Sequence, residues 1–167
     1  VSGELAVGAR VGTNNGDNST IQNATASVDV TGEQNVGGLV GFTNGIITDA
    51  TASGNVTATG DISRVGGLVG GNSGNITTAT ASGRITISGG GRGGGLVGRN
   101  DGTVINATAS GNVTTTGESG LAGGLVGGNS GNITTATASG NVTATPGISG
   151  GLVGRNSGNI TTTRASG

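Results

Sequence analysis

The sequence predicts an all-β fold, a right-handed, triangular, parallel β-solenoid of about six coils with roughly 28 residues and three short strands per coil. The first reason is a pentapeptide, GGLVG, that returns every 27 to 29 residues, with its leucine at Leu39, Leu68, Leu96, Leu125 and Leu152. The second is that Thr, Val, Ile and Gly dominate the repeat, which lacks helical periodicity. The right hand is expected by analogy with most β-solenoids.

Residues 66–93 illustrate one coil, because three strand-like runs alternate there with glycine and asparagine. The runs are GLVG at 67–70, ITTATAS at 76–82 and RITIS at 84–88. Glycine and asparagine adopt the backbone angles of tight corners more readily than other residues. The corner between the third strand and the next GGLVG varies most in sequence, and it reads GDISRV at 60–65, GGGRG at 89–93, GESGLA at 117–122 and PGIS at 146–149.

Alternation along the second and third strands assigns their faces. Ala79 and Ala81 should point inward while the neighbouring hydroxyls face solvent, and Ile85 should point inward from the third strand. Stacked coils then give three inner ladders. These are Ile21, Ile47, Ile76, Val104, Ile133, Ile160; Val28, Val56, Ile85, Val113, Val142; and Ala26, Ala52, Ala81, Ala109, Ala138, Ala165.

The first strand leaves two alternatives open, because leucine and valine are adjacent in GLVG and strict alternation places one of them outside. Either one of the two lies half-buried at a corner, or an exposed apolar stripe packs against another molecule.

The whole chain, 1–167, is expected to form one solenoid domain. A degenerate first coil spans 8–36, and further coils start near 37, 66, 94, 123 and 150. The last coil is expected to be incomplete, with residues 1–7 of a neighbouring subunit able to complete it.

Composition argues against catalysis, metal binding and cofactor binding. The chain has no His and no Cys, so the common nucleophile–base pairs and transition-metal ligands are missing. The carboxylates fall at different coil positions and form no visible pair. The glycine-rich run at 88–95 lacks the Lys-Ser/Thr of a phosphate loop. Net charge is −1 and no apolar run reaches membrane-span length, so neither nucleic-acid binding nor membrane insertion is expected.

The repeat GGLVG-x-N-x-G-x-I…G-x-V resembles the GLUG motif over about residues 8–167, with five clear copies and one degenerate copy. That family's repeats occur in bacterial surface adhesins and in non-catalytic parts of secreted proteases. The resemblance implies a secreted or cell-surface repeat protein with no catalytic residues to transfer. One departure is that threonine stands where an aromatic residue is expected, at Thr51, Thr80, Thr108 and Thr137.

Threonines of the third strand form a candidate ligand face. A T-x-T grid with about 4.8 Å between coils resembles the ice-binding faces of solenoid antifreeze proteins. Threonine is also simply a good residue for an exposed strand. The grid pairs Asp29 and Thr31 with Thr57 and Thr59 in the next coil. Its members are Thr31, Thr57, Thr59, Thr86, Ser88, Thr114, Thr116, Thr143 and Thr145.

Asn-x-Ser/Thr sequons are the second surface feature, and they are candidate glycan acceptors on a secreted chain. Turn geometry followed by a strand start explains the same pattern without glycans. The asparagines are Asn18, Asn23, Asn55, Asn75, Asn106, Asn112, Asn132, Asn141 and Asn159.

The two ends of the chain are the third feature, because neither carries a polar cap and the start resembles the strand that the end lacks. Two explanations are left open, head-to-tail stacking of copies and excision from a longer array. The candidate end residues are Val1, Leu5, Val7, Ile160, Ala165 and Ser166.

The sequence therefore predicts a non-enzymatic, extracellular or cell-surface structural protein, a fibre subunit or adhesin stalk that assembles with itself head to tail. Lateral bundling and binding to ice or surface glycans are further expected partner interactions. An ice-binding protein is the alternative function.

Overall fold

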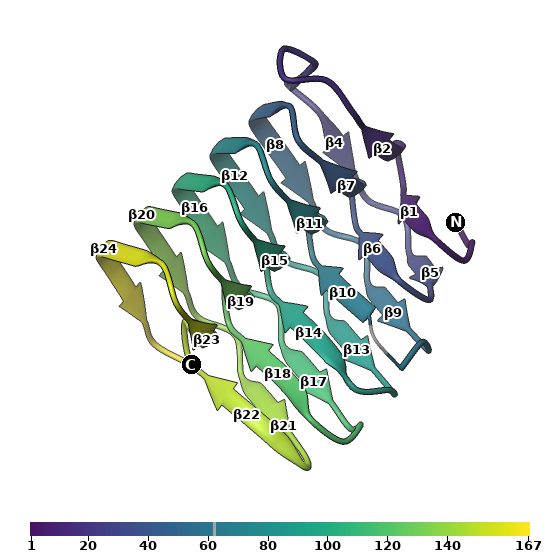
Figure 1. Cartoon of the computed structure of the whole chain (residues 1–167), viewed down its shortest axis with the longest axis vertical. Coiled ribbons are helices and arrows are strands. Elements are labelled where there is room, and N and C mark those ends of the chain that lie inside the picture. Colours follow the sequence, from purple (N-terminus) through teal and green to yellow (C-terminus); the bar gives the residue numbers. More distant parts are fainter. Residues whose placement is uncertain (62) are drawn as a thin grey trace.

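The computed structural model describes residues 1–61 and 63–167, which wind as one parallel β-solenoid of about six coils (Figure 1). Each interior strand pairs in parallel with its equivalents in the coils before and after. The described residues contain strands, bends and turns and no helix. The predicted fold class, a parallel β-solenoid with coils of about 28 residues, is confirmed.

The strands form four parallel sheets, which we call sheets A to D, and each coil visits them in the order B, C, D, A. Sheet B contains β1 (Ala6–Gly8), β6 (Asn35–Gly37), β10 (Ser63–Gly66), β14 (Gly91–Gly94), β18 (Gly120–Gly123) and β22 (Gly147–Gly150). Sheet C contains β2 (Val11–Asn14), β7 (Val40–Thr43), β11 (Val69–Asn72), β15 (Val97–Asn100), β19 (Val126–Asn129) and β23 (Val153–Asn156).

Sheet D carries the longest strands, and sheet A carries the shortest. Sheet D contains β3 (Thr20–Gln22), β4 (Thr25–Ala26), β8 (Ile46–Ala52), β12 (Asn75–Ala81), β16 (Thr103–Ala109), β20 (Asn132–Ala138) and β24 (Asn159–Ala165). Sheet A contains β5 (Val30–Gly32), β9 (Val56–Ala58), β13 (Ile85–Ile87), β17 (Val113–Thr115) and β21 (Val142–Ala144).

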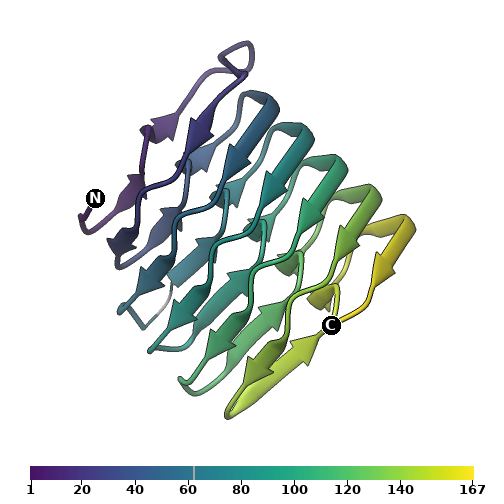
Figure 2. The ribbon, with the colours of Figure 1, turned by 180° about the vertical axis from the view of Figure 1, so that it is seen from behind.

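The cross-section is flattened into two layers. Sheets B and C form the nearer layer of Figure 1, and sheets D and A form the farther layer, which Figure 2 brings to the front. The nearer strands run towards the upper left of Figure 1 and the farther strands return, while successive coils advance to the lower left. This sense of rotation makes the solenoid right-handed.

The number of strands per coil differs from the prediction, because each complete interior coil has four strands in a flattened section, where three strands and a triangle were expected. The additional strand is the sheet B strand, and it overlaps the segments predicted to be the variable corner, ending one residue beyond each of them. From the second coil onward only the stretch before the sheet B strand varies in length, and in the first coil the connection between β2 and β3, residues 15–19, is also longer than its equivalents. Ile62, within the predicted corner 60–65, lies outside the described residues.

Two hydrophobic clusters fill the space between the layers. One packs sheet C against sheet D, and the other packs sheet B against sheet A. The predicted isoleucine and alanine ladders are both in register through all six coils. The valine ladder is wrong in its first member, since Val30 pairs with Val56 and Val28 is 51% exposed.

Leucine and valine of GGLVG are both fully buried in the interior coils, so both alternatives, a half-buried corner residue and an exposed stripe, are wrong. The reason is a bend at the leucine. The carbonyl oxygen of Leu125 accepts hydrogen bonds from Leu96 N at 2.9 Å and from Val97 N at 3.0 Å. Two successive donors to one acceptor interrupt the alternation as a β-bulge does, and adjacent side chains then face the same core.

Glycine at this bend is needed for close approach between coils. A Cβ atom built on Gly67 would lie 2.1 Å from the carbonyl oxygen of Gly95 and 3.0 Å from the Cβ of Ala81. Adjacent coils therefore stack backbone to backbone here, and the space admits no side chain.

Candidate functional site

The threonine ladder on sheet A runs in register through five coils and is the first candidate surface. Its members, paired strand to strand, are Thr31, Thr57, Thr86, Thr114 and Thr143. The predicted first-coil pair of Asp29 and Thr31 is wrong by two residues, because Thr31 pairs with Thr57 and not with Thr59. The ladder places one hydroxyl and one methyl in each coil, about 4.8 Å apart along the axis.

The second threonine column lies just beyond the ends of the sheet A strands, where the chain turns towards sheet B. Its amide groups still bond to the preceding coil, for example Thr116 N to the Ile87 carbonyl at 3.0 Å. All four residues are exposed, and they are Thr59, Ser88, Thr116 and Thr145. The predicted T-x-T grid therefore exists in four coils, and Glu33 occupies the corresponding place before Thr59.

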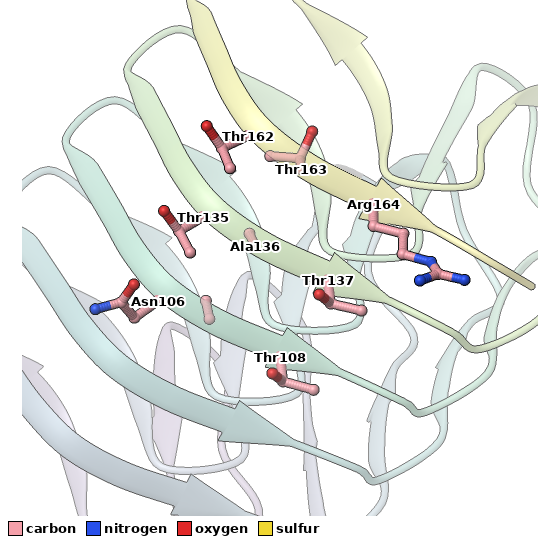
Figure 3. A pocket seen from close by; sticks show the side chains of 9 residues that line it. Asn106, Thr108, Thr135, Ala136, Thr137, Thr162, Thr163 and Arg164 are labelled. Atoms are coloured by element: carbon pink, nitrogen blue, oxygen red, sulfur yellow. The ribbon is translucent and has the colours of Figure 1, made fainter.

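Sheet D presents a further polar surface that sequence reasoning did not single out. One residue near the middle of each long strand, and Asn23 between β3 and β4 in the first coil, has a positive φ between 51° and 54°; those in the long strands are Asp49, Thr78, Asn106, Thr135 and Thr162. In Figure 3 Asn106, Thr135 and Thr162 form one row, and Thr108, Thr137 and Arg164 form another. The residues in the figure line an open depression of about 480 Å³.

The positive φ angles explain why the alternation of buried and exposed side chains is interrupted within these strands and then resumes. Ile76 is buried, Thr77 and Thr78 are not, and Ala79 is buried again. The left-handed region is disfavoured for L-residues and most of all for β-branched side chains, whereas asparagine tolerates it. Thr78, Thr135 and Thr162 therefore hold a backbone conformation that costs stability.

Substituting Thr78 by asparagine is expected to raise the free energy of unfolding by about 0.5–1 kcal/mol, because asparagine relieves this strain. Asn106 already occupies the equivalent place in the next coil. Urea unfolding of the variant measures the change. Thr80→Asn is the matched control, since its exposed strand position should gain nothing, and equal effects at both sites would refute the explanation.

A buried asparagine ladder lines the corner between sheets C and D. Asn72 Nδ2 donates to Asn100 Oδ1, Asn100 Nδ2 to Asn129 Oδ1, and Asn129 Nδ2 to Asn156 Oδ1, each at 2.8 Å. Each amide also bonds to the glycine two residues later, as Asn100 Nδ2 does to the Gly102 carbonyl at 3.2 Å. The recurring asparagine after GGLVG was the sequence signal for this ladder, which holds the corner closed.

The nine sequon asparagines are all exposed. Several have structural hydrogen bonds, since Asn55 Oδ1 accepts from Arg84 N at 3.1 Å and Asn112 Oδ1 from Asn141 N at 3.0 Å. Asn159 Nδ2 donates to Asn132 Oδ1 at 3.0 Å. These bonds link successive coils and give the asparagines a role in the turns. Glycosylation at these positions stays a prediction.

The ends of the described chain expose strand edges. Val1 and Leu5 are 59% and 65% exposed, and Val7 is buried. Residues 1–3 run beside β5, with Thr31 N bonded to the Val1 carbonyl at 2.8 Å and a bridge between Ser2 and Thr31. At the other end Ile160 is half-buried, and Ala165 and Ser166 are exposed.

Acidic residues do not gather in any part of the chain that the structure describes, and no group of three metal-ligating side chains occurs there. Within residues 1–61 and 63–167 no helix has the length and apolarity to span a bilayer.

Comparison with known families gives one match, to the GLUG motif. The model of that motif matches residues 32–57, 61–87, 89–114 and 118–143, which together make up more than half of the chain. No curated protein and no solved structure matches the chain. Each matched segment spans one turn of the solenoid, from the sheet A–sheet B corner round to the following sheet A strand.

Proposed function

Because the chain belongs to the GLUG-motif family, we propose that it is a non-enzymatic structural segment of an extracellular or cell-surface protein. It serves as a stiff rod in a fibre or adhesin stalk, and copies of it join head to tail.

The direction of the hydrogen bonds supports the rod. Bonds between coils run along the solenoid axis, as in the series from Leu39 N to the Leu68 carbonyl at 2.9 Å and from Leu68 N to the Leu96 carbonyl at 2.9 Å. Six coils at about 4.8 Å each span roughly 29 Å. An axial load is therefore shared by four sheets, and no single coil can stretch without breaking bonds in all of them.

Equivalent residues in the first and last coils are the observation that supports head-to-tail joining. The last sheet C strand reads VGRN at 153–156, and the first reads VGTN at 11–14. Ile160 and Ile21 share one ladder position, as do Ala165 and Ala26. The first coil of one copy can therefore continue the ladders of the last coil of another, in the way that exposed edges recruit strands.

Disrupting the end should abolish this association. Leu152→Lys combined with Val153→Lys places two charges in the half-buried last coil, where a following copy would have to bury them. Each coil of a solenoid contacts only its neighbouring coils, so the coils that precede the substituted last coil should stay folded. Sedimentation and electron microscopy are expected to show concentration-dependent filaments for the parent chain and single particles for the variant.

Thr114→Lys is the control, because it adds a charge on a side face and leaves the ends unchanged. It is expected to preserve end-to-end filaments and to weaken only lateral bundling. Isolated particles of the parent chain at every concentration would contradict the assembly proposal.

Ice binding through sheet A is a second candidate function, favoured by the in-register threonine grid from Thr57 to Thr145. Thermal hysteresis is then expected and should collapse in Thr86→Tyr or Thr114→Tyr, because a ring protrudes from the otherwise regular face. Thr80→Tyr puts the same ring on sheet D and should leave hysteresis intact. A parent chain without hysteresis at millimolar concentration would eliminate this function.

A further inference from the structure

Four of the seven arginines gather on the outer face of the layer formed by sheets B and C. They are Arg64 on β10, Arg92 on β14, Arg99 on β15 and Arg155 on β23. Arg64 and Arg92 are direct partners in adjacent strands. Opposed like charges of this kind are destabilising. The folded chain thus gathers four arginines on one face, where Glu33 and Asp61 share a depression with Arg64, and Asp61 and Glu118 share another with Arg92 and Arg155.

Three of these side chains surround Gly128. In sheet C the register runs Arg99, Gly128, Arg155, so the glycine separates two arginines that are two coils apart. The third arginine reaches across from sheet B, because a Cβ built on Gly128 would lie 3.0 Å from Cδ and 3.2 Å from Nε of Arg92. A side chain at position 128 would fill the space that the guanidinium of Arg92 approaches.

A cavity of about 200 Å³ lies among these groups. Besides Arg92, Arg99 and Arg155, its lining includes the hydroxyls of Ser130 and Ser157 and the side chain of Leu121. Ser157 Oγ donates to the Asn129 carbonyl at 3.2 Å and lies 3.4 Å from Ser130 Oγ. Guanidinium and hydroxyl donors around one small cavity are the groups that recognise a sulfate or a carboxylate.

The positive charge in the cavity is only partly balanced. Among the described residues one ion pair occurs, between Arg99 Nε and Asp101 Oδ2 at 2.8 Å. Partial burial lowers the pKa of Arg92, and the neighbouring charges of Arg99 and Arg64 lower it further, while Asp101 opposes them. Arginine stays protonated at neutral pH, so the cluster carries mutual repulsion that a bound anion would relieve.

We propose that this arginine pocket binds an anionic sugar unit of an acidic polysaccharide, through its sulfate ester or its uronic-acid carboxylate. The guanidinium groups of Arg92, Arg99 and Arg155 hold the anionic group. The two serine hydroxyls bond to sugar oxygens, and Leu121 packs against the apolar face of the ring. The pocket lies within a single copy, so binding is independent of head-to-tail assembly.

A polysaccharide fits the surface better than a nucleic acid does. Single-stranded nucleic acid is bound on aromatic stacking platforms beside a basic groove. The only aromatic residue of the chain is Phe42. It lies on β7, two coils before Arg99 in the same ladder, and therefore outside the pocket.

Titration of the full chain with dextran sulfate, polygalacturonate and neutral dextran tests the proposal. Dextran sulfate and polygalacturonate carry the two anionic groups and show which of them is preferred, and neutral dextran should not bind. The triple variant Arg92→Gln, Arg99→Gln, Arg155→Gln is expected to lose at least about thirtyfold in affinity, because each charge-assisted contact contributes severalfold or more.

The matched control removes the other three arginines outside the patch, Arg10→Gln, Arg84→Gln, Arg164→Gln, and so has the same net charge. It is expected to change the affinity less than about threefold, since only long-range attraction is lost. The triple pocket variant is expected to melt at a temperature no lower than that of the parent chain. If it melts lower, the single variant Arg155→Gln tests one exposed arginine of the pocket.

Three results would overturn the proposal. They are absence of binding to both acidic polymers at 50 mM salt, an equal loss of affinity in both triple variants, and binding of single-stranded DNA or anionic vesicles as tight as that of the polysaccharides with the same arginine dependence.

Discussion

Gly67→Ala is expected to destabilise the solenoid by more than about 3 kcal/mol, enough to unfold its central coils at moderate urea concentration. The added methyl group would lie 2.1 Å from the Gly95 carbonyl oxygen, a backbone atom held by the next coil. Neither side can yield, because Ala81 closes the space from sheet D at 3.0 Å. Relief requires separating two coils, which breaks the hydrogen bonds of the bend.

Gly71→Ala is the control within the same repeat. Its new methyl group would point outward and meet the ring of Phe42 at 3.0 Å, and an aromatic side chain at the surface can move aside. A change below about 1 kcal/mol is expected. Urea midpoints of the two variants compare the sites, and a small effect at Gly67 would show that adjacent coils are not packed backbone to backbone there.

Asn100→Ala is expected to lower the free energy of unfolding by about 3 kcal/mol. The side chain is fully buried, accepts from Asn72 and donates to Asn129. Removing it leaves the Oδ1 of Asn129 without this donor inside the protein and opens a cavity, and each of these effects costs about 1–3 kcal/mol.

Asn156→Ala makes the same chemical change at the exposed end of the ladder, where water replaces the lost amide. Its expected cost is below about 1 kcal/mol. Thermal unfolding of both variants gives the comparison. Equal destabilisation at the two positions would mean that burial of the amide ladder is not the source of its contribution.

Repeat spacing was sufficient to predict the fold class and two of the three inner ladders. Isoleucine and alanine recur in every coil at positions where one face is buried, so the register has a single solution. The valine ladder failed in the first coil because Val28 and Val30 have the same parity, and alternation alone cannot separate residues two apart. The distance from the preceding alanine distinguishes them, since Val30 follows Ala26 by the interval that separates Val56 from Ala52.

The sheet B strands could not be predicted from the repeat, because their sequences differ from coil to coil. Its outward ladder passes from Arg64 through Arg92 and Leu121 to Ile148. Its inward-facing residues differ as well. At Gly93, for example, a Cβ built on the glycine would lie 2.9 Å from Cδ1 of Ile87, which approaches from sheet A. Backbone pairing defines this sheet while its side chains vary.

Predicting the candidate surfaces required knowing which residues stack in neighbouring coils, and the sequence shows this only in part. The threonine grid followed from repeat spacing, except for the two-residue error at Asp29 and Thr31. The arginine pocket combines Arg92 of sheet B with Arg99 and Arg155 of sheet C, and it spans three coils. No local pattern links those positions, because the contact depends on a side chain lying across a glycine in another sheet.

Uniform stacking of the coils also means that the rod has a modular length. Residues 66–83 and 123–140 are identical, GGLVGGNSGNITTATASG, and they occupy the same places two coils apart. Recombination between the two encoding stretches would remove or insert whole turns and join strands that already match. Such a gene can lengthen or shorten its product in steps of two turns, about 10 Å at 4.8 Å per turn, and no junction has to be redesigned.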